Sequence, residues 1–89
     1  MDANEPLYIV CRNGVFILPE HVCKALEAQV PHGFVYLRQD DEVLTISTTR
    51  IEGGHRRVLS GRFRAPMFRA AKKLAIVNYN DSLRVMAVS

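Results

Sequence analysis

Tryptophan is absent from the 89 residues of this chain, and cysteine occurs only twice, as Cys11 and Cys23. Two cysteines are too few for the disulfide framework of a small secreted domain. No CxxC or HxxxH spacing offers a metal site. We therefore expect two buried free thiols in a reducing cytoplasm, no bound metal and no cofactor.

Long apolar runs are also missing. No stretch approaches the roughly 20 apolar residues that a membrane-spanning helix needs. The first residues, 1–6, lack the basic and apolar regions of a signal peptide. We expect a cytoplasmic protein without a membrane partner.

The residue patterns that support catalysis are lacking as well. No Asp or Glu stands at triad or metal-ligand spacing from any of the three histidines, which are His21, His32 and His55. Asp40, Asp41 and Glu42 are adjacent, so their side chains point in different directions and indicate a solvated turn rather than a cation site. We expect that the protein is not an enzyme.

What is present has ordinary globular composition, with 48% hydrophobic and 24% charged residues. A chain of about 90 residues forms one domain and buries about two-thirds of its surface. We therefore expect a single domain over residues 1–89, without a deep multi-part active site.

Charge is divided unevenly along the chain. A cut after Ser47 leaves three basic and seven acidic residues before it and nine basic and two acidic residues after it, so the halves carry about −4 and +7. Eight of the twelve basic residues lie between Arg50 and Lys73, and six of these are arginine, whose fork suits phosphate and guanine edges. This pattern indicates that the second half binds an anion. The alternative is that the basic stretch is a solvated face whose charge the acidic half balances.

A short pattern occurs twice, 47 residues apart, in residues 13–19 and residues 60–66. In each copy a proline stands five positions after a glycine, Pro19 after Gly14 and Pro66 after Gly61. Strand-like runs precede each glycine, and helical patterns follow each proline. The order strand, strand, helix, strand, strand is thus predicted twice, in pseudo-repeats 7–47 and 55–89 joined by 48–54. The fold class we expect is mainly β with two short helices, a small barrel of swapped-hairpin or double-psi type.

The expected strands are Leu7–Cys11, Phe34–Leu37, Val43–Ile46, His55–Leu59, Ile76–Tyr79 and Leu83–Val88, with turns at residues 38–42 and 80–82. After Pro66, the apolar spacing predicts a second amphipathic helix with Arg69, Lys72 and Lys73 on its polar side. We also expect the first half to have about seven additional residues in a loop between its helix and its third strand.

Asn13-Gly14 is a strong signal for a two-residue hairpin turn, and Ser60-Gly61 a usable one. A hairpin at Ser60-Gly61 would place Arg57 opposite Arg64 and Val58 opposite Phe63. One face would then carry three arginines, Arg57, Arg62 and Arg64, with Leu59. Such a ribbon has the size that the DNA major groove admits; the alternative is an edge ribbon kept soluble by its charge.

At these residues the sequence resembles the AbrB/MazE/MraZ group of swapped-hairpin DNA-binding domains. Residues 12–26 are similar to that group's glycine turn, apolar strand ending in proline and short helix; residues 40–46 are similar to its closing hairpin, and residues 60–66 to a second copy of the turn. The resemblance implies interleaved strand-strand-helix units that form one barrel, usually from two chains, with basic residues around the hairpin on DNA. It places that role on Arg12, Arg62 and Arg64, and it leaves open a barrel closed within one chain or a homodimer.

We therefore expect a small nucleic-acid-binding protein that contacts double-stranded DNA, a transcriptional regulator of the AbrB-like type. The alternative is a protein-interaction module, adaptor or antitoxin-like, that docks on an acidic partner protein. Single-stranded RNA binding by base stacking is a weaker third possibility. Tryptophan is absent, and most of the other aromatic residues, which are four phenylalanines with Tyr8, Tyr36 and Tyr79, sit in apolar runs typical of a core. The expected nucleic-acid-binding residues are Arg12, Arg56, Arg57, Arg62, Arg64, Arg69, Lys72 and Lys73.

Overall fold

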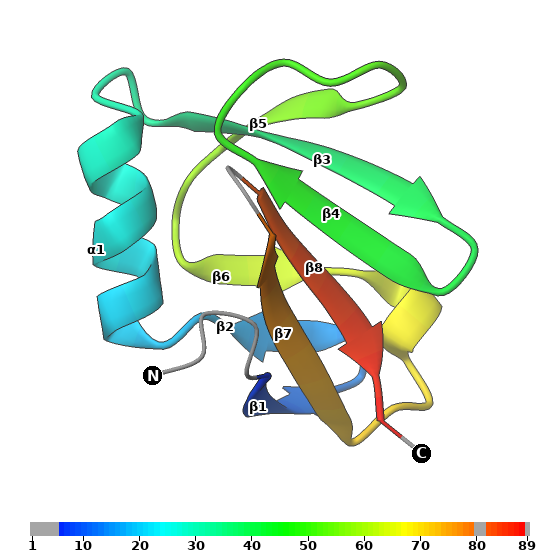
Figure 1. Cartoon of the computed structure of the whole chain (residues 1–89). Coiled ribbons are helices and arrows are strands. Elements are labelled where there is room, and N and C mark those ends of the chain that lie inside the picture. The colour runs from blue at the N-terminus through cyan, green and yellow to red at the C-terminus, as the bar shows by residue number, and fades with distance from the viewer. Residues whose placement is uncertain (1–5, 80–81, 89) are drawn as a thin grey trace.

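Eight strands form one antiparallel sheet that curls into a half-barrel, and α-helix α1 stands beside it (Figure 1). The computed structural model describes residues 6–79 and 82–88. Their elements are β1 (Leu7–Arg12), β2 (Val15–Ile17), α1 (Glu20–Gln29), β3 (Phe34–Asp40), β4 (Val43–Ser47), β5 (His55–Val58), β6 (Arg62–Arg64), the 3-10 turn η1 (Pro66–Phe68), β7 (Lys73–Tyr79) and β8 (Ser82–Ala87).

The strand order is β5-β3-β4-β8-β7-β1-β2-β6. Figure 1 shows β3, β4 and β5 on one side of the curl, β1, β2 and β6 on the other, and β7 and β8 between them. A mainly β, barrel-like fold is therefore confirmed. Within the described part of the chain, no helix is long and apolar enough to cross a membrane.

The Asn13-Gly14 hairpin is confirmed. Arg12 pairs with Val15 across the turn, and both turn residues have positive φ, 51° for Asn13 and 77° for Gly14, as a type I′ turn requires. Gly14 is also fixed by a close approach, since a Cβ there would lie 2.8 Å from the carbonyl oxygen of Ala65. The Ala65 N–H donates to the Gly14 carbonyl oxygen at 2.6 Å.

Three phenylalanine rings occupy the core where β2 meets β6. Phe16 and Phe63 are directly opposite in the β2–β6 ladder, and their rings stack at 5.5 Å between centroids. Phe68 of η1 meets Phe16 edge-on at 6.5 Å. Such aromatic pairs add to the hydrophobic gain of burying the rings. They hold β6 firmly against β2.

The predicted hairpin at Ser60-Gly61 is wrong. In the structure β5 pairs with β3, β6 pairs with β2, and no ladder between β5 and β6 occurs among residues 6–79 and 82–88. The predicted register would have set Arg57 directly opposite Arg64, and like charges at opposed positions destabilise a strand pair. The linking residues instead bond elsewhere: the Leu59 N–H donates to the Gly33 carbonyl at 2.9 Å, and the Gly61 carbonyl accepts from the Leu18 N–H at 2.8 Å.

The predicted second helix is also wrong, because only the three-residue turn η1 follows Ala65. Lys73 and Leu74, assigned to the helix from their spacing, begin β7 and pair with Val10 and Ile9 of β1. The Lys72 carbonyl accepts a hydrogen bond from the Cys11 N–H at 3.0 Å, which extends that pairing. Sheet pairing has overridden local helix propensity.

Two smaller expectations change as well. The additional length of the first half lies in α1, with ten residues against three in η1, rather than in the loop after it. β3 runs to Asp40, so the turn to β4 is Asp41-Glu42 and is shorter than predicted. Residues 80 and 81 of the other predicted turn lie outside the described residues.

The two glycines 14 and 33 offer a matched test of this packing. Both have φ near +80°, but a Cβ on Gly33 would have nothing within 4 Å. We expect Gly33→Ala to lower the free energy of unfolding by about 1–2 kcal/mol, the cost of a left-handed backbone. Gly14→Ala should cost more than about 3 kcal/mol, because the methyl group also forces Ala65 away and breaks its hydrogen bond. Urea denaturation of both variants measures the difference, and equal costs would contradict the close approach.

Candidate functional site

Three arginines share the outward face of β1, β2 and β6. Along each strand buried and exposed residues alternate: Cys11, Phe16 and Phe63 point inward, so their neighbours point outward. Arg12 pairs with Val15, and Val15 pairs with Arg64 on its other side, so the two arginines flank one valine. Ile17 pairs with Arg62 in the adjacent row. We call Arg12, Arg62 and Arg64 the arginine face.

More cations lie next to the β1 end of the arginine face. Arg69 and Lys72, in the segment between η1 and β7, line a shallow hollow of about 470 Å³ together with Arg12 and Asn13. Lys73 lies opposite Val10 in the ladder, and its ammonium sits 4.5 Å from the centre of the Tyr8 ring. The structure thus brings Arg12 together with the basic residues that were expected on the second helix.

An apolar stripe runs between these cations. The exposed fractions are 52% for Tyr8, 68% for Val10 and 68% for Ile17. A groove of about 840 Å³ is lined by these side chains and by Arg12 and Arg62. The expectation that the tyrosines lie in the core is wrong for Tyr8, because alternation along β1 puts Tyr8, Val10 and Arg12 on the same outward face.

The two arginines of β5 lie apart from the arginine face. Arg56 points outward with its guanidinium 4.8 Å from the centre of the Phe34 ring. Arg57 pairs with the fully buried Val35, so it points to the concave side of the sheet. The prediction that Arg57 shares a ribbon face with Arg62 and Arg64 is therefore wrong.

Arg57 and Arg64 nevertheless line the same cavity, which we call the seam cleft. It lies where the curled sheet fails to close between β5 and β6, and its volume is about 440 Å³. His55, two residues before Arg57 on β5, also lines the seam cleft. No pattern in the sequence pointed to His55 as a site residue. The lining residues are Leu37, Gln39, Leu44, Gly53, His55, Arg57, Arg64, Ala65 and Pro66.

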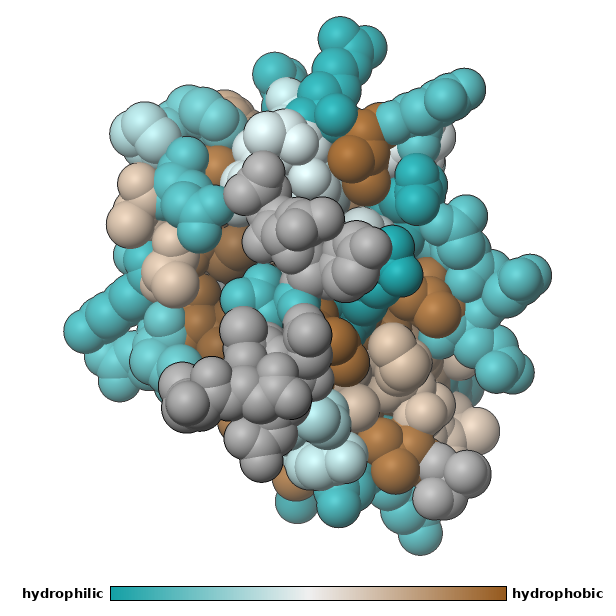
Figure 2. Space-filling view, viewed as in Figure 1, coloured by the Kyte–Doolittle hydropathy of each residue, from teal (hydrophilic) through white to brown (hydrophobic). Residues whose placement is uncertain are grey.

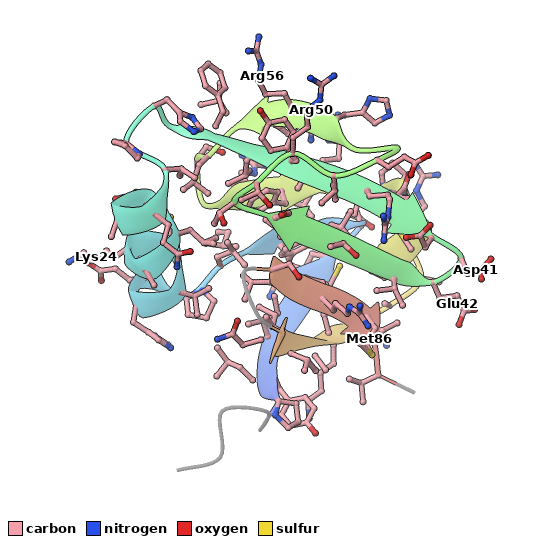
Figure 3. The ribbon with its side chains drawn as sticks, turned by 45° about the horizontal axis from the view of Figure 1, so that its top comes forward. Lys24, Asp41, Glu42, Arg50, Arg56 and Met86 are labelled. Carbon is pink, nitrogen blue, oxygen red and sulfur yellow. The ribbon has the colours of Figure 1, made fainter. Side chains whose placement is uncertain are left out.

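Carboxylates do not neutralise these cations within residues 6–79 and 82–88. The ion pairs in this part of the chain are Lys24 with Glu20 at 3.0 Å and Arg38 with Asp40 at 2.6 Å. Asp41 and Glu42 project from the β3–β4 turn, whereas Arg56 projects from a different side (Figure 3). Hydrophilic side chains extend into solvent around the rim of the molecule (Figure 2). No carboxylate of the described residues therefore competes with an external anion for the arginine face.

Other chemistry has little support in the described residues. They contain no cluster of three or more His, Cys, Asp or Glu side chains that could hold a metal ion. Both thiols are free. Cys11 is buried, as expected, and donates to the Phe68 carbonyl at 3.6 Å. The expectation of a buried thiol is wrong for Cys23, which is only partly buried and lies 3.6 Å from a Glu27 carboxylate oxygen. Desolvation raises the pKa of Cys23, and the hydrogen bond and negative charge of Glu27 raise it further.

Comparison with known proteins found no family model, no curated protein and no solved structure that matches this chain.

The raised pKa of Cys23 is testable by alkylation. The thiolate is the reactive form, so iodoacetamide should modify Cys23 more slowly at pH 7.5 than it modifies an unperturbed cysteine peptide. Glu27→Gln removes the negative charge, so the midpoint of the pH–rate curve should fall. Mass spectrometry of the modified peptide separates Cys23 from the buried Cys11. A midpoint that is unchanged in Glu27→Gln would contradict the contribution assigned to Glu27 and leave desolvation as the cause of the raised pKa.

Proposed function

We propose that this protein binds double-stranded DNA through the arginine face, with Arg69, Lys72 and Lys73 extending the contact along β1 and β7. The observation that carries the proposal is the shared outward orientation of Arg12, Arg62 and Arg64 without a carboxylate among the described residues to pair with them. About half or more of protein–DNA hydrogen bonds go to backbone phosphate and sugar, and arginine forks suit those oxygens.

The resemblance to AbrB-like regulators supports the same residues. That resemblance assigns the DNA contact to the basic residues around the glycine turns, which are Arg12, Arg62 and Arg64 here. We propose accordingly that the protein is a transcriptional regulator of this kind. Arg56 lies on β5 outside the arginine face, and it would contact DNA only if the duplex extends over that edge.

A duplicated, swapped-hairpin arrangement within one chain is part of the proposal. Its support is a set of reciprocal contacts separated by the same 47 positions as Gly14 and Gly61. Phe16 pairs with Phe63, its equivalent in the second copy. The hydrogen bond from the Ala65 N–H to the Gly14 carbonyl has a counterpart from the Leu18 N–H to the Gly61 carbonyl. Two related units that exchange contacts in this way would place the segments around Gly14 and Gly61, and hence their arginines, on one surface.

Single arginine variants test the proposal through salt dependence. Each phosphate contact releases counterions, so removing one contact lowers the slope of log K against log[salt] by about one. We expect Arg62→Ala and Arg64→Ala each to weaken binding to a random-sequence duplex and to lower the slope by about one. Fluorescence anisotropy at several salt concentrations measures both quantities.

Lys24→Ala is the matched control, because it also removes one exposed positive charge, but from the outer side of α1, where Lys24 projects away from the sheet (Figure 3). Its slope should equal that of the unsubstituted protein. If Arg62→Ala and Arg64→Ala bind duplex with unchanged affinity and slope, the arginine face is not the DNA site. If all three variants weaken binding equally, attraction by net charge alone explains the binding and the proposal fails.

A further inference from the structure

β5 and β6 each have a partner on one side only. The other side of each strand presents backbone N–H and C=O groups that no ladder uses in the described part of the chain. Such edges are templates for an additional strand. Here the two edges flank one cavity, the seam cleft, so a single inserted segment would have access to both.

The two edges are prevented from closing on each other. A β5–β6 hairpin would oppose Arg57 and Arg64, two like charges. Backbone hydrogen bonds also hold the segment between β5 and β6 at both ends. The Leu59 N–H donates to the Gly33 carbonyl, and the Gly61 carbonyl accepts from the Leu18 N–H. The Phe16–Phe63 stack keeps β6 on β2. The seam cleft is therefore a fixed feature of the fold rather than a gap that the chain can close by itself.

The lining of the seam cleft specifies the chemistry of its occupant. Arg57 from β5 and Arg64 from β6 supply positive charge, and no described ion pair contains either residue. Leu37, Leu44 and Pro66 supply apolar surface beside them. An occupant that suits both must carry carboxylates and apolar groups on a backbone that can pair with strand edges.

We propose that the seam cleft binds an extended acidic segment of a partner protein, which adds a strand to the β5 edge, the β6 edge or both. Arg57 and Arg64 would bind its carboxylates, and Leu37, Leu44 and Pro66 would contact apolar side chains that lie on the same face of the inserted strand as those carboxylates. A nucleic-acid strand can meet the arginines but has no peptide groups for the strand edges. A second copy of this chain is disfavoured by its own net charge of +3. The proposal is independent of DNA binding, although Arg64 lies at both sites.

A labelled peptide tests the inference on the full chain. Its Glu and Val residues take turns at every second position with Thr between them, so that both kinds of side chain lie on one face of the extended peptide. We expect saturable binding by fluorescence anisotropy, and about a tenfold or greater loss of affinity in Arg57→Ala, since charge-assisted hydrogen bonds are among the strong ones. Lys24→Ala should bind like the unsubstituted protein. A peptide with Lys in place of Glu should not bind. The acidic peptide with N-methyl groups at alternate residues should bind much more weakly, because it cannot pair with a strand edge.

Backbone amide shifts on titration locate the site, and circular dichroism checks that Arg57→Ala is folded. Shifts in β5 and β6 support the proposal. Equal binding of Arg57→Ala and the unsubstituted protein, equal binding of the N-methylated peptide, or shifts confined to other strands would each overturn it. Duplex titration separates the two proposals: Arg57→Ala should keep DNA binding and lose the peptide, whereas Arg12→Ala should do the reverse. If both variants keep duplex binding, the proposed DNA site is wrong, but the proposed peptide site is unaffected.

Discussion

The β2–β6 contact is the constraint on which the rest of the structure depends. Phe16 and Phe63 stack face to face at its centre. Hydrogen bonds close it on both sides, from the Ala65 N–H to Gly14 and from the Leu18 N–H to the carbonyl of the second glycine turn. Because strand residues alternate between faces, inward phenylalanines force the residues beside them outward. Burial in the core thus sets the direction of the charged residues.

The same contact explains why the sheet stays open. By holding β6 on β2, it separates β6 from β5, which pairs with β3 on the other side of the curl. Arg57 and Arg64 would repel each other if the two strands met. One interaction therefore creates two adjacent cationic features, the arginine face of Arg12, Arg62 and Arg64 and the seam cleft lined by Arg57 and Arg64. They share Arg64, but Arg12 lies only at the arginine face and Arg57 only at the seam cleft, so variants of these two residues can distinguish the ligands assigned to them.

The sequence predicted correctly those elements that depend on neighbouring residues alone. The Asn13-Gly14 turn, the helix after Pro19 and the strand character of most segments follow from φ preferences, proline and apolar alternation. Strand partners were not predictable in this way: the Ser60-Gly61 pattern indicates a hairpin, but non-local packing against β2 prevails. The helical spacing after Pro66 likewise yields to pairing with β1. The outward direction of Arg62 and Arg64 was still inferred correctly, because alternation around Phe63 is independent of the strand's partner.

The most direct test of the arginine face is an NMR titration that follows the side-chain Nε–H signals of the arginines as a short duplex is added. Arg38, paired with Asp40 on β3, provides an internal reference. The account predicts that the signals of Arg12, Arg62 and Arg64 shift together and saturate at one duplex concentration, while that of Arg38 stays in place. Shifts confined to arginines outside the β1–β2–β6 face, or no shift in any arginine, would contradict it.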